Sequence, residues 1–158
     1  MASRQDEFER VALPHSRSLL RVARRLTANS SAAEDLVQET LLSAWRGFHQ
    51  LRPDSNARAW LFRILFNAFY AQGRRKPLPT VPLSAEMQTF SPVHDEILEI
   101  SRALDSLEVD HRAALLLAVV EGFTCREIAE ILHVPIGTVM SRLSRARQAM
   151  RTRVLVRA

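Results

Sequence analysis

The stretch 123-FTCREIAEILHVPIGTVMSRLSRARQAM-150 decides the architecture of the second half of the chain. Thr124 and Glu127 have the spacing of a capping box, which predicts that a helix begins near Cys125. After a short turn, Pro135 suits the first turn of another helix, where its missing N–H costs nothing. Two helices joined by a tight turn predict a helix-turn-helix.

The second of these helices separates into two faces. We expect an inward face of Ile136, Val139, Leu143, Ala146 and Met150, and an outward face of Thr138, Ser141, Arg142, Arg145 and Gln148. No acidic residue follows Glu130, and a carboxylate on this surface would repel phosphate. The pattern favours a helix that reads duplex DNA through Thr138, Ser141, Arg142 and Arg145, and the alternative is a solvated amphipathic helix.

Bulk composition narrows the class of protein. The 158 residues are 47% hydrophobic and 25% charged, which is typical of a globular chain of one domain or two small ones. The longest apolar run is far shorter than a membrane span requires, so we expect a cytoplasmic protein without membrane insertion. A single cysteine excludes an internal disulfide or a cysteine-based zinc site, and we expect no metal, cofactor or catalytic site. A net charge of +5 carried almost wholly by arginine indicates a nucleic-acid partner.

Charge and proline content divide the chain. Residues 1–76 hold 13 basic and 7 acidic side chains, whereas residues 94–130 hold 3 basic and 9 acidic ones. Between them, residues 77–93 carry four of the seven prolines and no helical periodicity, which predicts an extended linker. Strand-type alternation is missing on both sides. The sequence predicts an all-α fold with two small helical domains, 1–76 and 94–158, joined by that linker.

A helix predicted from about Ala32 to Trp45 follows Ser31 and Glu34, which have the spacing of a capping box. Its wheel sets a broad apolar face against a narrow stripe of Asp35, Gln38, Glu39, Leu42 and Arg46. A solvated face is the ordinary interpretation of such a stripe. A leucine flanked by carboxylates in a basic domain instead favours a docking surface for a basic partner helix.

The helix predicted over 57–76 also has two faces. Leu61, Phe62, Leu65, Phe66, Ala68 and Phe69 form its core face, and the opposite side presents Asn56, Trp60, Arg63, Asn67, Tyr70 and Arg74, continued by Arg75. Aromatic rings between cationic side chains are what single-stranded nucleic acid needs, because bases stack on the rings and guanidinium groups follow the phosphates. The alternative is that Trp60 and Tyr70 pack under a neighbouring helix.

Together, "AEDLVQETLLSAW", "ARAWLFRILFNAFY", the proline-rich linker and "EGFTCREIAEILHVPIGTVMSRLSRAR" resemble the extracytoplasmic-function (ECF) class of bacterial sigma factors, in the right order over nearly the whole chain. The resemblance implies that the stripe of Asp35, Gln38, Glu39 and Leu42 binds core RNA polymerase at the β′ coiled coil, with further contacts to the β subunit. It implies that the face from Asn56 to Arg75 helps to melt the minus-ten element and holds its non-template strand. The helix carrying Arg142 would enter the major groove at the minus-thirty-five element.

The resemblance also implies an anti-sigma factor as a partner, and it leaves the catalysis to the polymerase. Three positions depart from the family pattern. His133 stands where the turn usually has glycine, Met140 replaces a commonly basic residue, and Ala71 lies where aspartate is frequent. His133 therefore has to adopt a left-handed conformation.

Other functions remain open from the residues alone. A stand-alone helix-turn-helix regulator would bind DNA without being a polymerase subunit. A serine recombinase would need an α/β catalytic domain, and an adaptor that binds polymerase alone would not need the arginines of the last helix.

Overall fold

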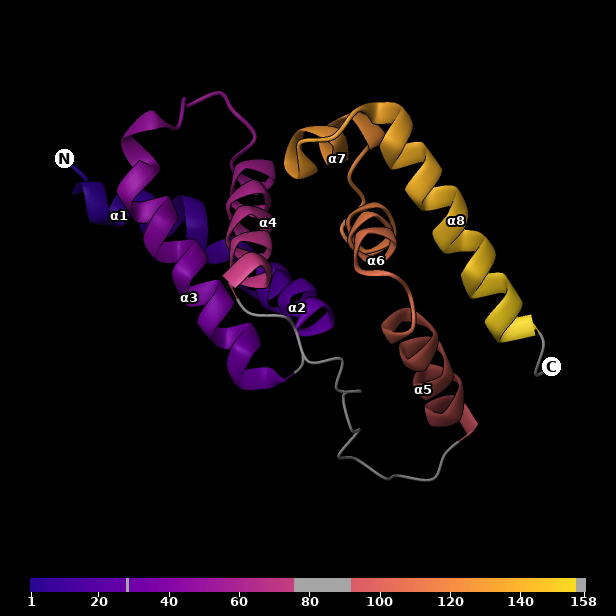
Figure 1. Ribbon diagram of the computed structural model, residues 1–158. Coiled ribbons are helices and arrows are strands. Elements are labelled where there is room, and N and C mark those ends of the chain that lie inside the picture. Colours follow the sequence, from indigo (N-terminus) through magenta and orange to yellow (C-terminus); the bar gives the residue numbers. More distant parts are fainter. Residues whose placement is uncertain (28, 76–91, 156–158) are drawn as a thin grey trace. The chain divides into compact units, whose positions relative to one another are not determined.

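The computed structural model describes residues 1–27, 29–75 and 92–155. Over these residues the chain is helical and contains no strand, which confirms the all-α prediction. The contacts divide it into two compact units, one built on α1 to α4 and the other mainly on α5 to α8, with Glu130–His133 at the end of α7 grouped with the first (Figure 1). Residues 77–91 of the predicted linker lie outside the described residues, and α5 begins at Pro92.

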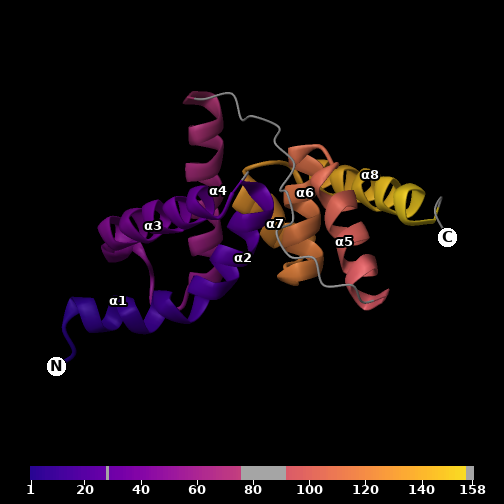
Figure 2. The same ribbon diagram turned by 90° about the horizontal axis from the view of Figure 1, so that it is seen from below.

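The first unit contains α1 (Arg4–Ala12), η1 (Leu13–His15), α2 (Ser16–Leu26), α3 (Ser30–Gly47), η2 (Phe48–Gln50) and α4 (Ala57–Arg75). Pro14 lies in the 3-10 turn η1, so the predicted break in the first helical segment is confirmed. Figure 2 shows α3 and α4 as separate long helices that cross within this unit.

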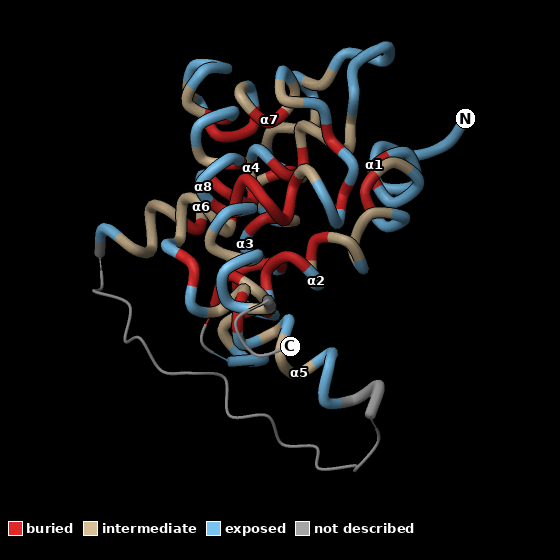
Figure 3. The backbone as a smooth tube through the Cα atoms, turned by 90° about the vertical axis from the view of Figure 1, so that its right-hand side faces the viewer, coloured by how far each residue is buried: buried red, intermediate tan, exposed pale blue. Residues whose placement is uncertain are grey.

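The core of the first unit is formed where α2, α3 and α4 meet. Figure 3 marks buried residues in red on all three of these helices. The buried side chains include Leu19, Val22, Leu26, Leu36, Val37, Thr40, Leu61, Phe62, Leu65, Phe66 and Phe69. Thr40 is polar but fully buried, and its hydroxyl donates to the carbonyl of Leu36 at 2.7 Å, which satisfies it inside the apolar layer.

Asparagine residues begin both long helices of this unit. The Oδ1 atom of Asn29 accepts a hydrogen bond from the Ala32 N–H at 2.7 Å, so α3 begins before the predicted Ser31 cap. The Ser31–Glu34 capping box was therefore wrong, because Asn29 caps as well as serine and lies two residues earlier. Likewise, Asn56 Oδ1 accepts from the Ala59 N–H at 3.0 Å and caps α4.

His15 should make the stability of the first unit depend on pH. Partial burial, followed by the positive charge of Arg58, lowers the pKa of His15 below its ordinary value of 6.5. Between the pKa of His15 in the folded chain and its value of 6.5 in the unfolded chain, the unfolded chain binds more protons. The contribution of His15 to the free energy of unfolding is therefore fully present above pH 6.5 and is lost as the pH falls through the folded pKa. Both tryptophans, Trp45 and Trp60, lie in this unit, so their fluorescence during urea titration reports its unfolding alone. His15→Gln should remove part of the pH dependence, and an unchanged dependence would contradict the assignment.

The second unit is built mainly from α5 (Pro92–Asp105), α6 (Val109–Leu115), the π-helical turn η3 (Leu116–Val120), α7 (Cys125–Leu132) and α8 (Ile136–Leu155). Arg112 closes the corner between α5 and α6. Its guanidinium donates to the carbonyls of Leu104, Asp105 and Leu107 at 2.9, 2.7 and 2.9 Å. The Leu104 carbonyl also accepts a hydrogen bond from the Leu107 N–H at 3.1 Å. Arg112 thus adds donors for carbonyls at and just beyond the end of α5, so this arginine stabilises the fold.

The turn between α7 and α8 matches the expected helix-turn-helix. Thr124 and Glu127 form the predicted capping box, with the Glu127 N–H donating to Thr124 Oγ1 at 3.2 Å and the Thr124 N–H to Glu127 Oε1 at 3.1 Å. His133 has a φ of 54°, which confirms the left-handed conformation. The Val134 N–H then donates to the carbonyl of Ala129 at 3.1 Å, a Schellman closure that ends α7. The helix α8 begins directly after Pro135.

Candidate polymerase and nucleic-acid interfaces

The acidic stripe on α3 is exposed to solvent on the surface of the first unit. Asp35, Gln38, Glu39 and Leu42 are all exposed, and Leu42 keeps 57% of its surface accessible. The opposite side of the same helix is buried at Leu36, Val37, Thr40 and Ala44. The fold therefore holds these four side chains on one outward line, as the periodicity predicted. Their role in binding polymerase stays a prediction.

Within this docking stripe (Asp35, Gln38, Glu39 and Leu42), Glu39 is tied to the neighbouring helix. Gln72 on α4 donates from Nε2 to Glu39 Oε2 at 2.7 Å. The second oxygen of a carboxylate has lone pairs of its own, so this contact orients Glu39 without using up its capacity to accept. Gln72 was not recognised in the sequence, because nothing in its local pattern says which helix packs beside it.

The predicted strand-binding face of α4 is partly at the surface and partly packed. Arg63, Asn67 and Arg74 are exposed, whereas Trp60 and Tyr70 are half-buried. Arg75 ends α4, and its side chain lies outside the described part of the chain. Asn56, at the start of the same face, is exposed and also serves as the cap of α4.

The two aromatic residues of this face differ in their surroundings. The Tyr70 ring lies 5.3 Å from that of Phe69 and 6.3 Å from that of Phe66, measured between centroids. Tyr70 therefore extends the core aromatic cluster, as the packing alternative foresaw. Trp60 lies against the end of α3, where a Cβ added to Gly47 would stand 3.8 Å from its Cζ2 atom. One edge of the indole lies against α3 there, so Trp60 is a better candidate than Tyr70 for stacking on an unpaired base.

On α8 the predicted outward residues form one face. Ser141 and Arg145 are exposed and Thr138 and Arg142 are half-buried, while Val139, Leu143 and Ala146 are buried in the core of the second unit. The prediction for Ile136 was wrong, since it retains 47% of its surface. It lies at the first residue of α8, before the helix makes its core contacts, so wheel position alone does not bury it.

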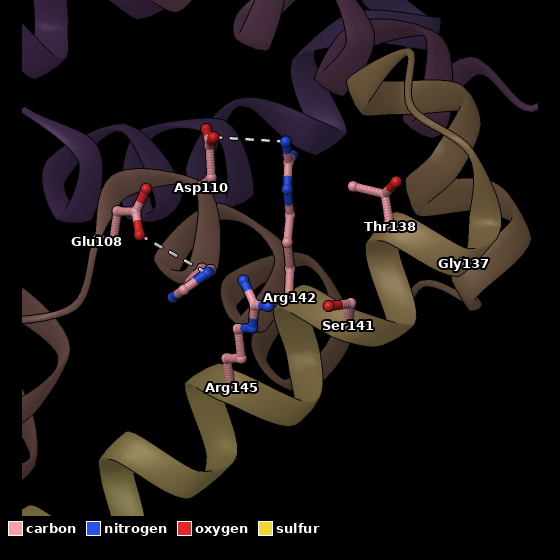
Figure 4. Close-up of a pocket in the computed structure, with 8 residues that line it drawn as sticks. Glu108, Asp110, Gly137, Thr138, Ser141, Arg142 and Arg145 are labelled. Atoms are coloured by element: carbon pink, nitrogen blue, oxygen red, sulfur yellow. Dashed lines mark ion pairs between the residues drawn. The ribbon is translucent and has the colours of Figure 1, made fainter.

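A shallow hollow of about 370 Å³ borders this face of α8, lined by Glu108, Asp110, His111, Gly137, Thr138, Ser141, Arg142 and Arg145. Figure 4 shows Arg142 extending from α8 towards Asp110. Its Nη2 atom lies 3.4 Å from Asp110 Oδ2. Both groups are only partly exposed, so the pair orients the guanidinium and places a negative charge beside the surface that would meet phosphate.

Asp110→Asn should raise the affinity of the chain for duplex DNA. The substitution keeps the shape of the side chain but removes a carboxylate that repels phosphate, so we expect binding about two- to fivefold tighter at low salt. Fluorescence anisotropy with a labelled duplex at two salt concentrations would measure it. Glu96→Gln, the same charge change at an exposed site on α5, is the control and should have a smaller effect. Weaker binding by Asp110→Asn would mean that orienting Arg142 outweighs the repulsion.

A second basic row on α8 was missed in the sequence. Arg147 and Arg151 are exposed and line another hollow of about 460 Å³ together with Cys125, Met140, Leu143, Ser144 and Gln148. This row and the row of Arg142 and Arg145 lie on opposite sides of the outward line through Ser141. The major groove is bounded by phosphates on both sides, so a helix lying in it can use both rows. The spacing of Arg147 and Arg151 was the available signal.

Residues 1–27, 29–75 and 92–155 show neither a metal site nor a membrane-spanning helix. These residues contain no cluster of histidine, cysteine, aspartate and glutamate able to hold a metal ion. None of their helices combines the length and the apolar character needed to cross a membrane.

Two family models match this chain. The model described as Sigma-70 region 2 matches residues 12–76, and the one described as Sigma-70, region 4 matches residues 97–150. The ECF RNA polymerase sigma factor EcfG of Rhodopseudomonas palustris (strain TIE-1) is 37% identical over 139 residues, covering 84% of this chain and 77% of EcfG. The ECF RNA polymerase sigma factor SigM of Mycobacterium tuberculosis (strain ATCC 25618 / H37Rv) is 37% identical over 147 residues, covering 89% of this chain and 73% of SigM.

Solved structures show the same architecture. The sigma factor RpoE of Bartonella quintana, in complex with the anti-sigma factor NepR, superposes with a TM-score of 0.77 at 32% identity, covering 95% of this chain and 98% of that one. CnrH in complex with the cytosolic domain of CnrY gives a TM-score of 0.74 at 24% identity, covering 98% of this chain and 91% of that one, a likeness of fold.

Proposed function

We propose that this chain, which belongs to the ECF class of RNA polymerase sigma factors, divides promoter recognition between its two units. The first unit binds core polymerase and holds the melted minus-ten strand, and the second reads the minus-thirty-five element. The polymerase supplies the catalysis, so the chain is a specificity subunit and not an enzyme. It acts in the cytoplasm.

The observation that carries this proposal is the chemistry of the docking stripe. Leu42 is exposed among Asp35, Gln38 and Glu39 on a helix of the first unit, while the DNA-reading arginines lie on α8 of the second. A stand-alone helix-turn-helix regulator needs the second surface but has no use for the first. A partner helix rich in basic side chains around an apolar position would match the stripe in charge and shape. The β′ coiled coil of core polymerase is the partner that we assign to it, with β-subunit contacts beside it.

The exposed side of α4 supports a role in strand separation. Arg63, Asn67 and Arg74 offer charge and hydrogen bonds along one line, and Trp60 offers a ring with one edge beside Gly47 of α3. An unpaired base can stack on such a ring while the guanidinium groups follow the phosphates of the same strand. Asn56, Tyr70 and Arg75 complete the proposed strand site, with Tyr70 acting through its packing on Phe66 and Phe69.

We also propose that an anti-sigma factor regulates this chain. RpoE, which is 32% identical and matches 95% of the chain, was solved in complex with the anti-sigma factor NepR. A protein that covered the docking stripe would keep the sigma factor away from polymerase, so the exposed surface around Leu42 is a natural target for such control.

The proposed division of labour is tested by replacing Asp35 and Gln38 together with alanine. We expect binding of labelled protein to bacterial core polymerase to weaken about tenfold, because two polar contacts of the stripe are lost. Fluorescence anisotropy measures this binding, and a titration of the same variant with duplex DNA in the absence of polymerase is the control. An equal loss in both titrations would refute the division. No binding of the wild-type chain to polymerase would favour a stand-alone regulator.

A further inference from the structure

An exposed apolar residue lies beside the proposed DNA-reading face of α8, on the side of Arg147 and Arg151. Met140 retains 58% of its surface, and Ile136, one helical turn before it, retains 47%. Their neighbours towards solvent are the polar Ser141 and Ser144. Exposed apolar side chains gain from contact with another apolar group, and Met140 can neither donate a strong hydrogen bond nor pair with phosphate.

The backbone beside Met140 leaves room for a close approach. Gly137 lies in the first turn of α8, and a Cβ added there would meet nothing within 4 Å. Its φ is not in the left-handed region, so the turn does not require glycine for its conformation. Glycine also weakens a helix relative to alanine. The surface in front of this turn is therefore open at Gly137, three residues before Met140.

The charges around Ile136 and Met140 indicate which class of molecule binds this side of α8. Arg147 and Arg151 continue along the helix on the side of Met140, and Arg142 and Arg145 lie on the other side of Ser141. From residue 131 to residue 155 the described chain carries no acidic side chain. A protein partner with an apolar surface would not require two rows of arginine. A nucleic-acid duplex does, because each side of its major groove is lined by phosphates.

We propose that Met140 recognises the 5-methyl group of a thymine in the minus-thirty-five element, with Gly137 admitting the base edge. The inference rests on the proposed function of α8 and adds its base preference. Among the four bases, thymine alone presents an apolar group in the major groove, so an exposed methionine there favours thymine by contact. A basic side chain at the same position would favour guanine, whose O6 and N7 atoms accept hydrogen bonds.

Uracil-for-thymine substitution tests this contact, because it removes the methyl group and leaves the hydrogen-bonding edge unchanged. The full chain is assembled with core polymerase, and the preferred minus-thirty-five duplex is selected from a randomised pool. Each thymine of that duplex is then replaced by uracil in turn. We expect one position at which the wild-type complex loses about three- to fivefold in affinity, the value of one buried methyl group.

Variants assign the effect to Met140. In Met140→Ala the same thymine and uracil duplexes should bind equally, and Met140→Arg should select guanine at that position. Val119→Ala removes a similarly exposed apolar side chain that belongs to η3 and not to α8, and it should keep the thymine preference. A thymine preference that persists in Met140→Ala, or no position sensitive to uracil, would overturn the inference while leaving the proposed function intact. If the pool yields no preferred duplex at all, the proposed function and the inference both fail.

Discussion

Replacing Arg142 and Arg145 together with alanine should lower the affinity of the polymerase complex for a minus-thirty-five duplex about a hundredfold, since each specific arginine contact contributes roughly 1–3 kcal/mol. The two guanidinium groups lie on one side of α8, at the hollow lined by Thr138 and Ser141. The slope of the logarithm of affinity against the logarithm of salt concentration should fall by about two if both arginines touch phosphate. Anisotropy titrations over a salt series measure both quantities.

Because Arg142 is paired with Asp110, its removal leaves a partly exposed carboxylate without that partner, and the fold must be checked by thermal melting. The matched control is Arg17→Ala with Arg24→Ala, which removes two exposed arginines from α2 of the first unit. It causes the same loss of charge but should change the affinity for the duplex far less. Similar losses in both double variants would mean that net charge, not the face of α8, carries the binding.

Trp60→Ala should slow the formation of open complexes about tenfold while leaving initial promoter binding nearly unchanged. Stacking of an unpaired base on an aromatic ring contributes roughly 1–3 kcal/mol, and this contribution exists only once the strand has separated. Permanganate reactivity of unpaired thymines measures melting, and a mobility-shift assay on duplex promoter DNA measures the earlier step. Equal effects on the two steps would show that Trp60 acts before melting.

Trp60→Phe is the control for this prediction, because it keeps a flat ring against Gly47 and should retain most of the melting activity. A melting defect in Trp60→Phe as large as that in Trp60→Ala would point to the indole N–H instead of stacking. Normal permanganate reactivity in Trp60→Ala would remove the tryptophan from the strand site and favour its packing role.

Periodicity and caps predicted much of this fold because they depend on residues close together in the chain. The alternation on α3 and α4 and the Thr124–Glu127 box needed only three- and four-residue spacings, and all appear in the structure. Competition between local signals was harder to resolve. Asn29 and Ser31 are both good caps, and only the path of the chain into α3 decides between them.

Features set by tertiary packing could not be read from the sequence. Which side of α8 stays open depends on how the rest of its unit packs against it, so the helical wheel wrongly placed Ile136 in the core. The four-residue spacing of Arg147 and Arg151 is visible in the sequence, but the hollow beside them is set by the fold. In the same way, the Gln72–Glu39 hydrogen bond joins positions 33 residues apart, and no short-range pattern specifies it.

Arg112 bears on how genetic screens of this protein are to be interpreted. Its three hydrogen bonds to carbonyls join the end of α5 to α6, so its loss should be as damaging in a promoter-activity screen as the loss of an arginine that meets DNA. Intolerance to substitution alone would then place it falsely on the recognition surface. Temperature separates the two classes, because a folding defect is relieved by growth in the cold and a missing DNA contact is not.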